Sequence, residues 1–264
     1  MDYLMSLSPF LIVCLVTTFN WLMTFLGASL VFFVKKASNK IVCFALGSSA
    51  GIMVGASFFS LIMPALEQLK NGDKVELLII PLGFICGTAF LMIIDKLLPH
   101  EHMISHDQEG INPNNYSKNK LLLLAMTLHN IPEGLAVGIA FAGSQNGNYL
   151  PALMVAIGIG IQNFPEGTAI SLPLYQCGKS KIAALMYGQF SALVEIPAAL
   201  IGYVFASLIN GLLPFALCFA AGAMMFVCIE ELIPEANRTK GIDFGTASFM
   251  IGFVIMMSFD IFFS

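Results

Sequence analysis

Long apolar segments alternate with short polar ones along almost the whole chain. Eight of the apolar segments reach about 20 residues, the length that an α-helix needs to cross the hydrocarbon core of a bilayer. The pattern predicts an all-α polytopic membrane protein, with one transmembrane domain over residues 1–264. The expected spans are Pro9–Val34, Ile41–Leu66, Leu77–Ile94, Leu121–Ala142, Tyr149–Tyr175, Ile182–Ile209, Pro214–Pro234 and Phe244–Phe263.

The composition argues against a soluble fold. Hydrophobic residues make up 58% of the 264 residues and charged residues 11%, with a mean hydropathy of +0.85. A soluble domain is nearer a quarter charged. No basic patch points to nucleic acid. The first apolar segment lacks a positive leader and is too long for a signal peptide, so we expect it to be a retained span.

The loops between the expected spans carry an uneven share of positive charge. The second loop holds Lys70 and Lys74, whereas the fourth and sixth loops and both tails hold no Lys or Arg. By the positive-inside rule, both termini face outside and the odd-numbered loops face the cytoplasm of a multi-pass plasma-membrane protein. The longest polar segment, residues 96–120, is expected to be a mobile cytoplasmic loop. The odd-numbered loops hold the other ten Lys and Arg residues: Lys35, Lys36, Lys40, Lys96, Lys118, Lys120, Lys179, Lys181, Arg238 and Lys240.

One polar hexapeptide occurs twice within the apolar segments. His129–Gly134 reads HNIPEG, and Gln162–Gly167 reads QNFPEG. The two copies lie on adjacent spans that run in opposite directions, so they are inverted across the bilayer. A weaker echo, which slips by one residue, links Ala50–Pro64 with Ala221–Pro234. Together they predict a 3+2+3 inverted repeat, a pattern typical of transporters with a site near the midplane.

Carboxylates are the second unusual feature of the spans. Glu133, Glu166, Glu195, Glu230 and Glu231 all fall within them, whereas no Lys or Arg does. A charge at the bilayer centre costs on the order of 3 kcal/mol or more. With no internal base to pair them, a bound cation is the simplest partner. For the last two acids, which lie close to Pro234, solvation at the cytoplasmic interface is an equally open interpretation.

The spacing within each hexapeptide brings ligand types onto one helix face. His129 and Glu133 are four residues apart, and Asn130 and Glu133 three apart. Gln162, Asn163 and Glu166 repeat this geometry. Pro132, Pro165 and Pro197 also free the carbonyls of Leu128, Ile161 and Leu193, each near a carboxylate. An imidazole with carboxylate and amide oxygens suits Zn²⁺, Fe²⁺, Mn²⁺, Co²⁺ or Cd²⁺. A lone polar residue of this kind could instead be a packing feature, but a repeated set favours a metal site.

A second group of candidate ligands lies in the 96–120 loop. His100, Glu101, His102 and His106 form the pattern HEHxxxH. The three histidines could collect metal that leaves the membrane, or they could be solvated loop residues. The pattern is not HExxH, so it gives little support to a zinc protease.

These residues resemble the ZIP (Zrt/Irt-like) metal transporters, especially the bacterial GufA-like branch. The resemblance rests on the paired hexapeptides, and also on Ala56–Pro64 and Glu230–Glu235. It implies eight helices, outward termini, an elevator-like motion and a homodimer. It also implies a binuclear midplane site. The first metal would be held by His129, Glu133, Gln162 and Glu166, with Met53 nearby, and the second by Asn130, Glu133, Asn163, Glu166 and Glu195.

Two positions depart from the family pattern. Many members carry His where this chain has Gln162, and some binuclear relatives carry Asp where it has Asn163. From the site residues and the family resemblance, we expect a divalent-metal importer that is not an enzyme and needs no catalytic cofactor. Zinc is the foremost substrate, with cadmium, iron and manganese as further candidates. The alternatives are a cation-coupled transporter of an organic solute, which would favour an intramembrane Arg or Lys, and a membrane metalloenzyme.

Overall fold

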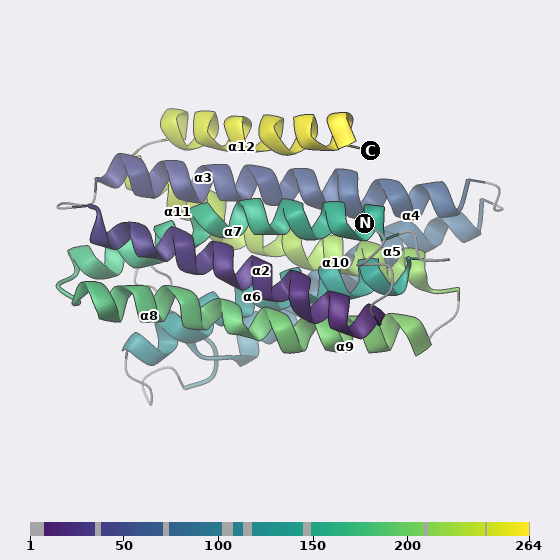
Figure 1. Cartoon of the computed structure of the whole chain (residues 1–264), viewed down its shortest axis with the longest axis horizontal. Coiled ribbons are helices and arrows are strands. Elements are labelled where there is room, and N and C mark those ends of the chain that lie inside the picture. Colours follow the sequence, from purple (N-terminus) through teal and green to yellow (C-terminus); the bar gives the residue numbers. More distant parts are fainter. Residues whose placement is uncertain are drawn as a thin grey trace.

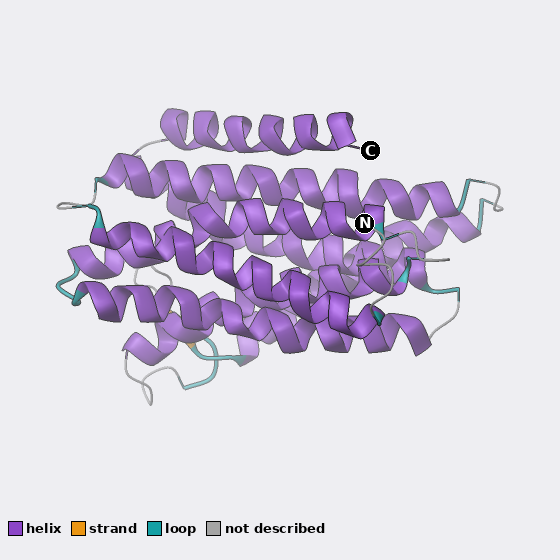
Figure 2. Ribbon diagram, in the orientation of Figure 1, coloured by secondary structure: helices purple, strands orange, loops and turns teal. Residues whose placement is uncertain are grey.

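The computed structural model describes residues 8–34, 38–70, 74–101, 108–112, 118–144, 149–208, 211–240 and 242–263. They form a bundle of long helices that run roughly along one axis, with α12 on its outer edge beside α3 (Figure 1). Helix dominates the described residues (Figure 2).

The eight expected spans correspond to eight helical segments, several of them built from consecutive pieces. The pieces are α2 (Pro9–Ser29) with η1 (Leu30–Phe32); α3 (Asn39–Gly55), η2 (Ala56–Ile62) and α4 (Met63–Gln68); η3 (Glu76–Leu78) with α5 (Ile79–Leu97); α6 (Lys118–Ala142); α7 (Leu150–Gln176); α8 (Lys181–Ser191), η6 (Ala192–Val194) and α9 (Glu195–Leu208); α10 (Leu213–Val227), η7 (Cys228–Leu232) and α11 (Ile233–Lys240); and α12 (Ile242–Phe263).

The seventh segment is longer than the sequence predicted. We expected it to end at Pro234, but helix continues to Lys240. Pro234 lies inside this continuous segment, as the second residue of α11. The π-helical turn η7 precedes it, and the N–H of Ile233 bonds to the carbonyl of Cys228 five residues earlier, so the α-helical register that a proline would break is already shifted.

Six helical segments within the described ranges are long and apolar enough to cross a membrane. α6 and α7, which carry the hexapeptides, are not among the six, although their 25 and 27 residues are long enough to span a bilayer. Gln162, Asn163 and Glu166 lower the mean hydropathy in the middle of α7. The six segments are Pro9–Phe32, Asn39–Gln68, Glu76–Leu97, Lys181–Leu208, Leu213–Arg238 and Asp243–Phe262.

The helices alternate in direction, so the two ends of the bundle differ in charge. α2 begins and α12 ends at the same end of the bundle, on the right of Figure 1. α2, α7 and α11 end and α3 begins at the opposite end of the bundle, and Lys40, Lys179 and Arg238 lie close to those helix ends in the sequence. The alternation on which the loop-charge argument depends is therefore present in the fold.

The helix packing repeats between the two halves of the chain. α2 packs closely along α7, and α9 packs in the same way along α6; α3 pairs with α12, and α10 with α5. Glycines allow the first two of these contacts. A Cβ on Gly27 would lie 1.9 Å from the Phe164 carbonyl oxygen, and one on Gly138 would lie 1.9 Å from that of Ala199. If the first three segments are exchanged with the last three, and the two central segments with each other, each of these helix pairs becomes another of the four pairs.

π-Helical turns mark the second and seventh segments at matching places. η2 lies directly before the turn that contains Pro64, as η7 does before Pro234. A π-turn inserts an extra residue into a helix. Two such turns of different length, seven residues and five, are consistent with the one-residue slip between the two sequence stretches.

Described residues of the 96–120 segment, which the sequence predicted to be a mobile loop, form a short β-hairpin pairing. β1 (His100–Glu101) pairs antiparallel with β2 (Gln108–Glu109), and β1 packs against α6. His102 and His106 lie outside the described residues.

Candidate metal site

The two hexapeptides meet where α6 and α7 cross the middle of the bundle. Their terminal glycines let neighbouring helices approach. A Cβ on Gly134 would lie 2.4 Å from the carbonyl oxygen of Glu195 on α9, and one on Gly167 would lie 2.2 Å from that of Thr24 on α2. Four helices therefore converge on the hexapeptides.

Gln162 joins the two glutamates of the repeat. Its Nε2 donates to Glu133 Oε1 at 2.7 Å and to Glu166 Oε2 at 2.6 Å. Asn130 Nδ2 donates a longer hydrogen bond, of 3.4 Å, to Glu166 Oε1. All four side chains are buried. The amide of Gln162 thus stands between two carboxylates, where a cation would also be attracted.

Asn163 and Glu195 form a second pair beside the first. Asn163 Nδ2 donates to Glu195 Oε1 at 2.8 Å, and both side chains are fully buried. Glu195 begins α9 directly after the 3-10 turn η6, and Pro197 follows two residues later. The break in the sixth segment therefore falls at the carboxylate, as the proline predicted.

His129 pairs with a residue that the sequence left unassigned. Its Nε2 forms an ion pair with Glu231 Oε2. Glu231 is only 6% exposed, whereas Glu230 is exposed. Glu231 is thus part of the buried cluster rather than a solvated residue at the interface. The two adjacent acids were indistinguishable in sequence, because the phase of the helix at η7 decides which of them faces inward.

Asn20 on α2 is the other residue that sequence reasoning missed. It is fully buried, and its backbone carbonyl accepts from Asn163 Nδ2 at 3.4 Å. An asparagine in the middle of an apolar span was the available signal.

The remaining predicted ligands have different surroundings. Met53 is buried on α3, which packs against α7, and it stays a predicted ligand. His100 is buried rather than solvated. Its Nδ1 lies 2.9 Å from the Leu98 carbonyl oxygen, and its Nε2 lies 3.2 Å from Asp95 Oδ1.

The cluster leaves several buried oxygens without a hydrogen-bond partner. Buried polar atoms are normally paired, so such atoms indicate a missing ligand or water. Among the residues described, no three His, Cys, Asp or Glu side chains already stand in a metal-binding arrangement. A turn of the amides would expose their oxygens, and with His129 the set then fits a divalent transition metal. The unpartnered oxygens are Glu133 Oε2, Gln162 Oε1, Asn163 Oδ1, Glu195 Oε2 and Asn20 Oδ1.

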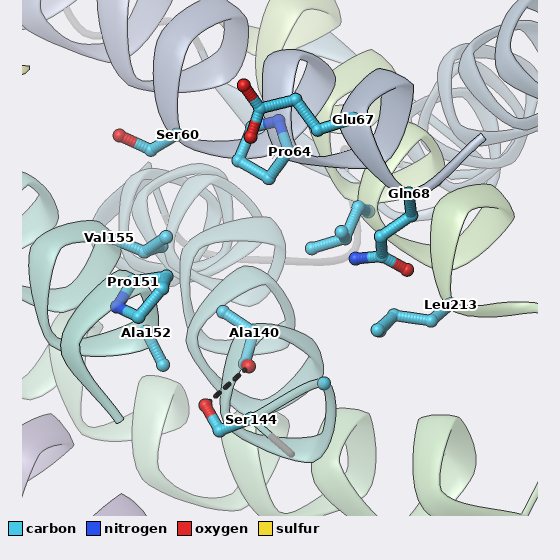
Figure 3. Close-up of a pocket in the computed structure, with 12 residues that line it drawn as sticks. Ser60, Pro64, Glu67, Gln68, Ala140, Ser144, Pro151, Ala152, Val155 and Leu213 are labelled. Atoms are coloured by element: carbon cyan, nitrogen blue, oxygen red, sulfur yellow. Dashed lines mark hydrogen bonds between the residues drawn. The ribbon is translucent and has the colours of Figure 1, made fainter. Parts of the chain in front are cut away.

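A cavity of about 440 Å³ opens where α4 approaches the end of α6 and the start of α7. Figure 3 shows Ser60, Glu67 and Gln68 on one wall, facing Ala140 of α6 and Ser144, which follows the end of that helix. α7 and α10 complete its lining. Ala140 lies seven residues beyond Glu133 on α6, which corresponds to about 10 Å along the helix. The cavity therefore ends within about two helical turns of the buried carboxylates.

Comparisons with known proteins agree with this chemistry. Residues 100–212 match the family described as ZIP Zinc transporter. The chain is 33% identical to zinc transporter ZIP11 of Xenopus tropicalis, over 96% of this chain and 98% of that protein. It is 38% identical to zinc transporter GufA of Myxococcus xanthus, over 90% and 93%. It is 32% identical to zinc transporter ZupT of Clostridium perfringens, over 95% of each. Similarity of this extent, which includes GufA, confirms the resemblance found in the hexapeptides, and the chain belongs to the ZIP family.

Proposed function

We propose that this protein imports divalent transition metals, zinc foremost, from outside the cell to the cytoplasm. One observation carries the proposal. Glu133, Glu166 and Glu195 are buried together in the middle of a membrane bundle, with unpartnered oxygens and bonded amide groups beside them. Such a group of acids favours a bound cation. His129 adds the nitrogen ligand that zinc and cadmium favour over calcium or magnesium.

Polar groups continue on both sides of the cluster. The cavity lined by Ser60 and Glu67 leads from the outer end of the bundle. On the other side, the ion pair of His129 with Glu231 follows the cluster. Beyond it, Asp95 and His100 face the cytoplasmic end, where β1 packs on α6. We infer that the metal moves along this series of carboxylates and imidazoles.

The proposed mechanism is alternating access through eight spans. α6 and α7 would count as spans four and five, with both termini outside the plasma membrane. The repeated helix pairing supports a 3+2+3 inverted repeat. Movement of α6 and α7 against a scaffold of α3, α5, α10 and α12 would open the site to each side in turn. A homodimer completes the proposal by analogy with the family.

The metal position is proposed to be binuclear. His129, Glu133, Gln162 and Glu166 would hold one metal, with Met53 nearby. The second would be held by Asn130, Asn163 and Glu195, with Glu133 and Glu166 shared. The metal is the transported substrate, so the protein needs no catalytic cofactor and acts as a carrier rather than an enzyme.

Zinc uptake into proteoliposomes tests the proposal. Glu133→Gln keeps the shape of the side chain but removes its charge. We expect uptake to fall at least about tenfold. Loss of a residue that only supports a metal ligand already lowers metal affinity or activity by about tenfold or more. Glu76→Gln, an exposed acid at the outer end of the bundle, serves as control. Uptake by Glu133→Gln at the wild-type rate would contradict the metal-site assignment.

A further inference from the structure

Asn20 is a buried amide whose side-chain oxygen has no hydrogen-bond partner. It lies in the middle of α2 and is fully buried; its amide interacts with Glu195 without a well-formed hydrogen bond, and its Oδ1 stays unpartnered. Two other polar side chains on the same helix, Thr17 and Thr24, are also buried, but their hydroxyls donate to carbonyls one turn earlier. Leaving an amide oxygen unpaired in a bilayer is unfavourable, so Asn20 Oδ1 is available to a ligand.

The side chain of Asn20 lies beside the Asn163–Glu195 pair. It faces the carboxylate of Glu195, and its backbone carbonyl accepts from Asn163 Nδ2. α2 packs against both α7 and α9, the helices that carry the pair. Asn20 Oδ1 would stand 3.0 Å from a Cβ built on Gly160, so the absence of a side chain there leaves it room. Three helices thus direct amide and carboxylate groups to one place.

We propose that Asn20 is a ligand of the second metal position. Nothing in the sequence of the hexapeptides indicates this role. The inference rests on the proposed metal transport. The available atoms are Asn20 Oδ1, Asn163 Oδ1, Glu195 Oε2 and Glu133 Oε2. With its ring paired to Glu231, His129 belongs to the other side of the cluster.

This donor set determines the class of cation. All four atoms are oxygens, two from neutral amides and two from carboxylates. Oxygen-only sites suit hard cations such as Mn²⁺ and Mg²⁺, whereas imidazole suits Zn²⁺ and Cd²⁺. The two positions therefore differ in selectivity: the histidine position takes the softer metal, and the Asn20 position takes a hard one.

Manganese binding to the zinc-loaded full chain tests the proposal. One equivalent of Zn²⁺ fills the histidine position first, since Zn²⁺ binds such ligands more tightly than Mn²⁺. Mn²⁺ is then titrated and followed by electron paramagnetic resonance. We expect one bound Mn²⁺ without magnetic coupling to histidine nitrogen. Asn20→Leu should weaken its affinity at least about tenfold, while the affinity for the first Zn²⁺ stays within about twofold. Thr17→Val on the same helix should change neither affinity.

Asn20→Asp separates a ligand from a packing residue. A carboxylate retains the oxygen donor, so Mn²⁺ should bind as tightly as in the wild type or more tightly. If Asn20→Leu does not fold, Asn20→Ser takes its place. The proposal is overturned by unchanged Mn²⁺ affinity after loss of the amide, by coupling of the bound Mn²⁺ to histidine nitrogen, or by no Mn²⁺ binding beside Zn²⁺. Failure of folded wild-type protein to bind Zn²⁺ would instead refute the proposed function.

Discussion

Replacing Gln162 by Leu tests whether its amide occupies the place of the metal. The amide donates to Glu133 at 2.7 Å and to Glu166 at 2.6 Å, and all three side chains are buried. Leu fills most of the same volume but cannot donate. The two carboxylates then face each other with no group between them.

The expected loss follows from these two bonds. A hydrogen bond to a charged group contributes about 1.5–3 kcal/mol, so the metal-free protein should lose at least about 3 kcal/mol. For a chain of this size, that corresponds to an apparent Tm lower by roughly 6–12 °C. Saturating Zn²⁺ should reduce the deficit to less than half, because the metal then neutralises both carboxylates in place of the amide.

Thermal unfolding of the purified protein in detergent, with and without Zn²⁺, measures both quantities. Gln189→Leu is the matched control, since Gln189 is another buried glutamine whose Oε1 accepts from Trp21 Nε1 at 2.9 Å and contacts no carboxylate of the cluster. Its deficit should be smaller, about 1 kcal/mol, and independent of Zn²⁺. The reasoning is refuted if the Gln162→Leu deficit is the same with and without metal.

Three further substitutions test other parts of the structure. Glu231→Gln should slow zinc uptake about tenfold or more. Glu230→Gln, which changes the exposed neighbouring acid, should leave uptake unchanged, and equal effects of the two substitutions would contradict the inward position of Glu231. Asn163→Asp adds a charge to the second position and should alter the competition profile among Zn²⁺, Cd²⁺, Fe²⁺ and Mn²⁺ in an uptake assay. An unaltered profile would count against that position. Gly134→Ala forces α6 away from α9, where overpacking costs about 1–3 kcal/mol, so the apparent Tm and uptake should both fall; a stable, active variant would show that the close approach is dispensable.

Hydrophobic patterning was enough to locate the helices. All eight expected segments are helical, because runs of apolar residues of spanning length have few alternatives once backbone groups must pair internally. Their ends agree with the prediction to within about three residues except at Pro234, where helix continues through a proline that follows the π-turn. The repeated hexapeptide also indicated the candidate site, since buried carboxylates beside prolines are costly enough to be informative wherever they occur.

Rotational position about the helix axes was beyond the sequence. Glu230 and Glu231 are adjacent and chemically identical, and the π-turn that contains them determines which one meets His129. In the sequence, Asn20 is only one polar residue in an apolar span. Its place beside the buried carboxylates follows from the packing of α2 against α7 and α9. By itself, the sequence determined the helices, their alternating direction and the chemistry of the hexapeptides. Only the tertiary structure decided which polar side chains from distant helices meet, because that depends on helix phase and close packing at glycines, which no local pattern encodes.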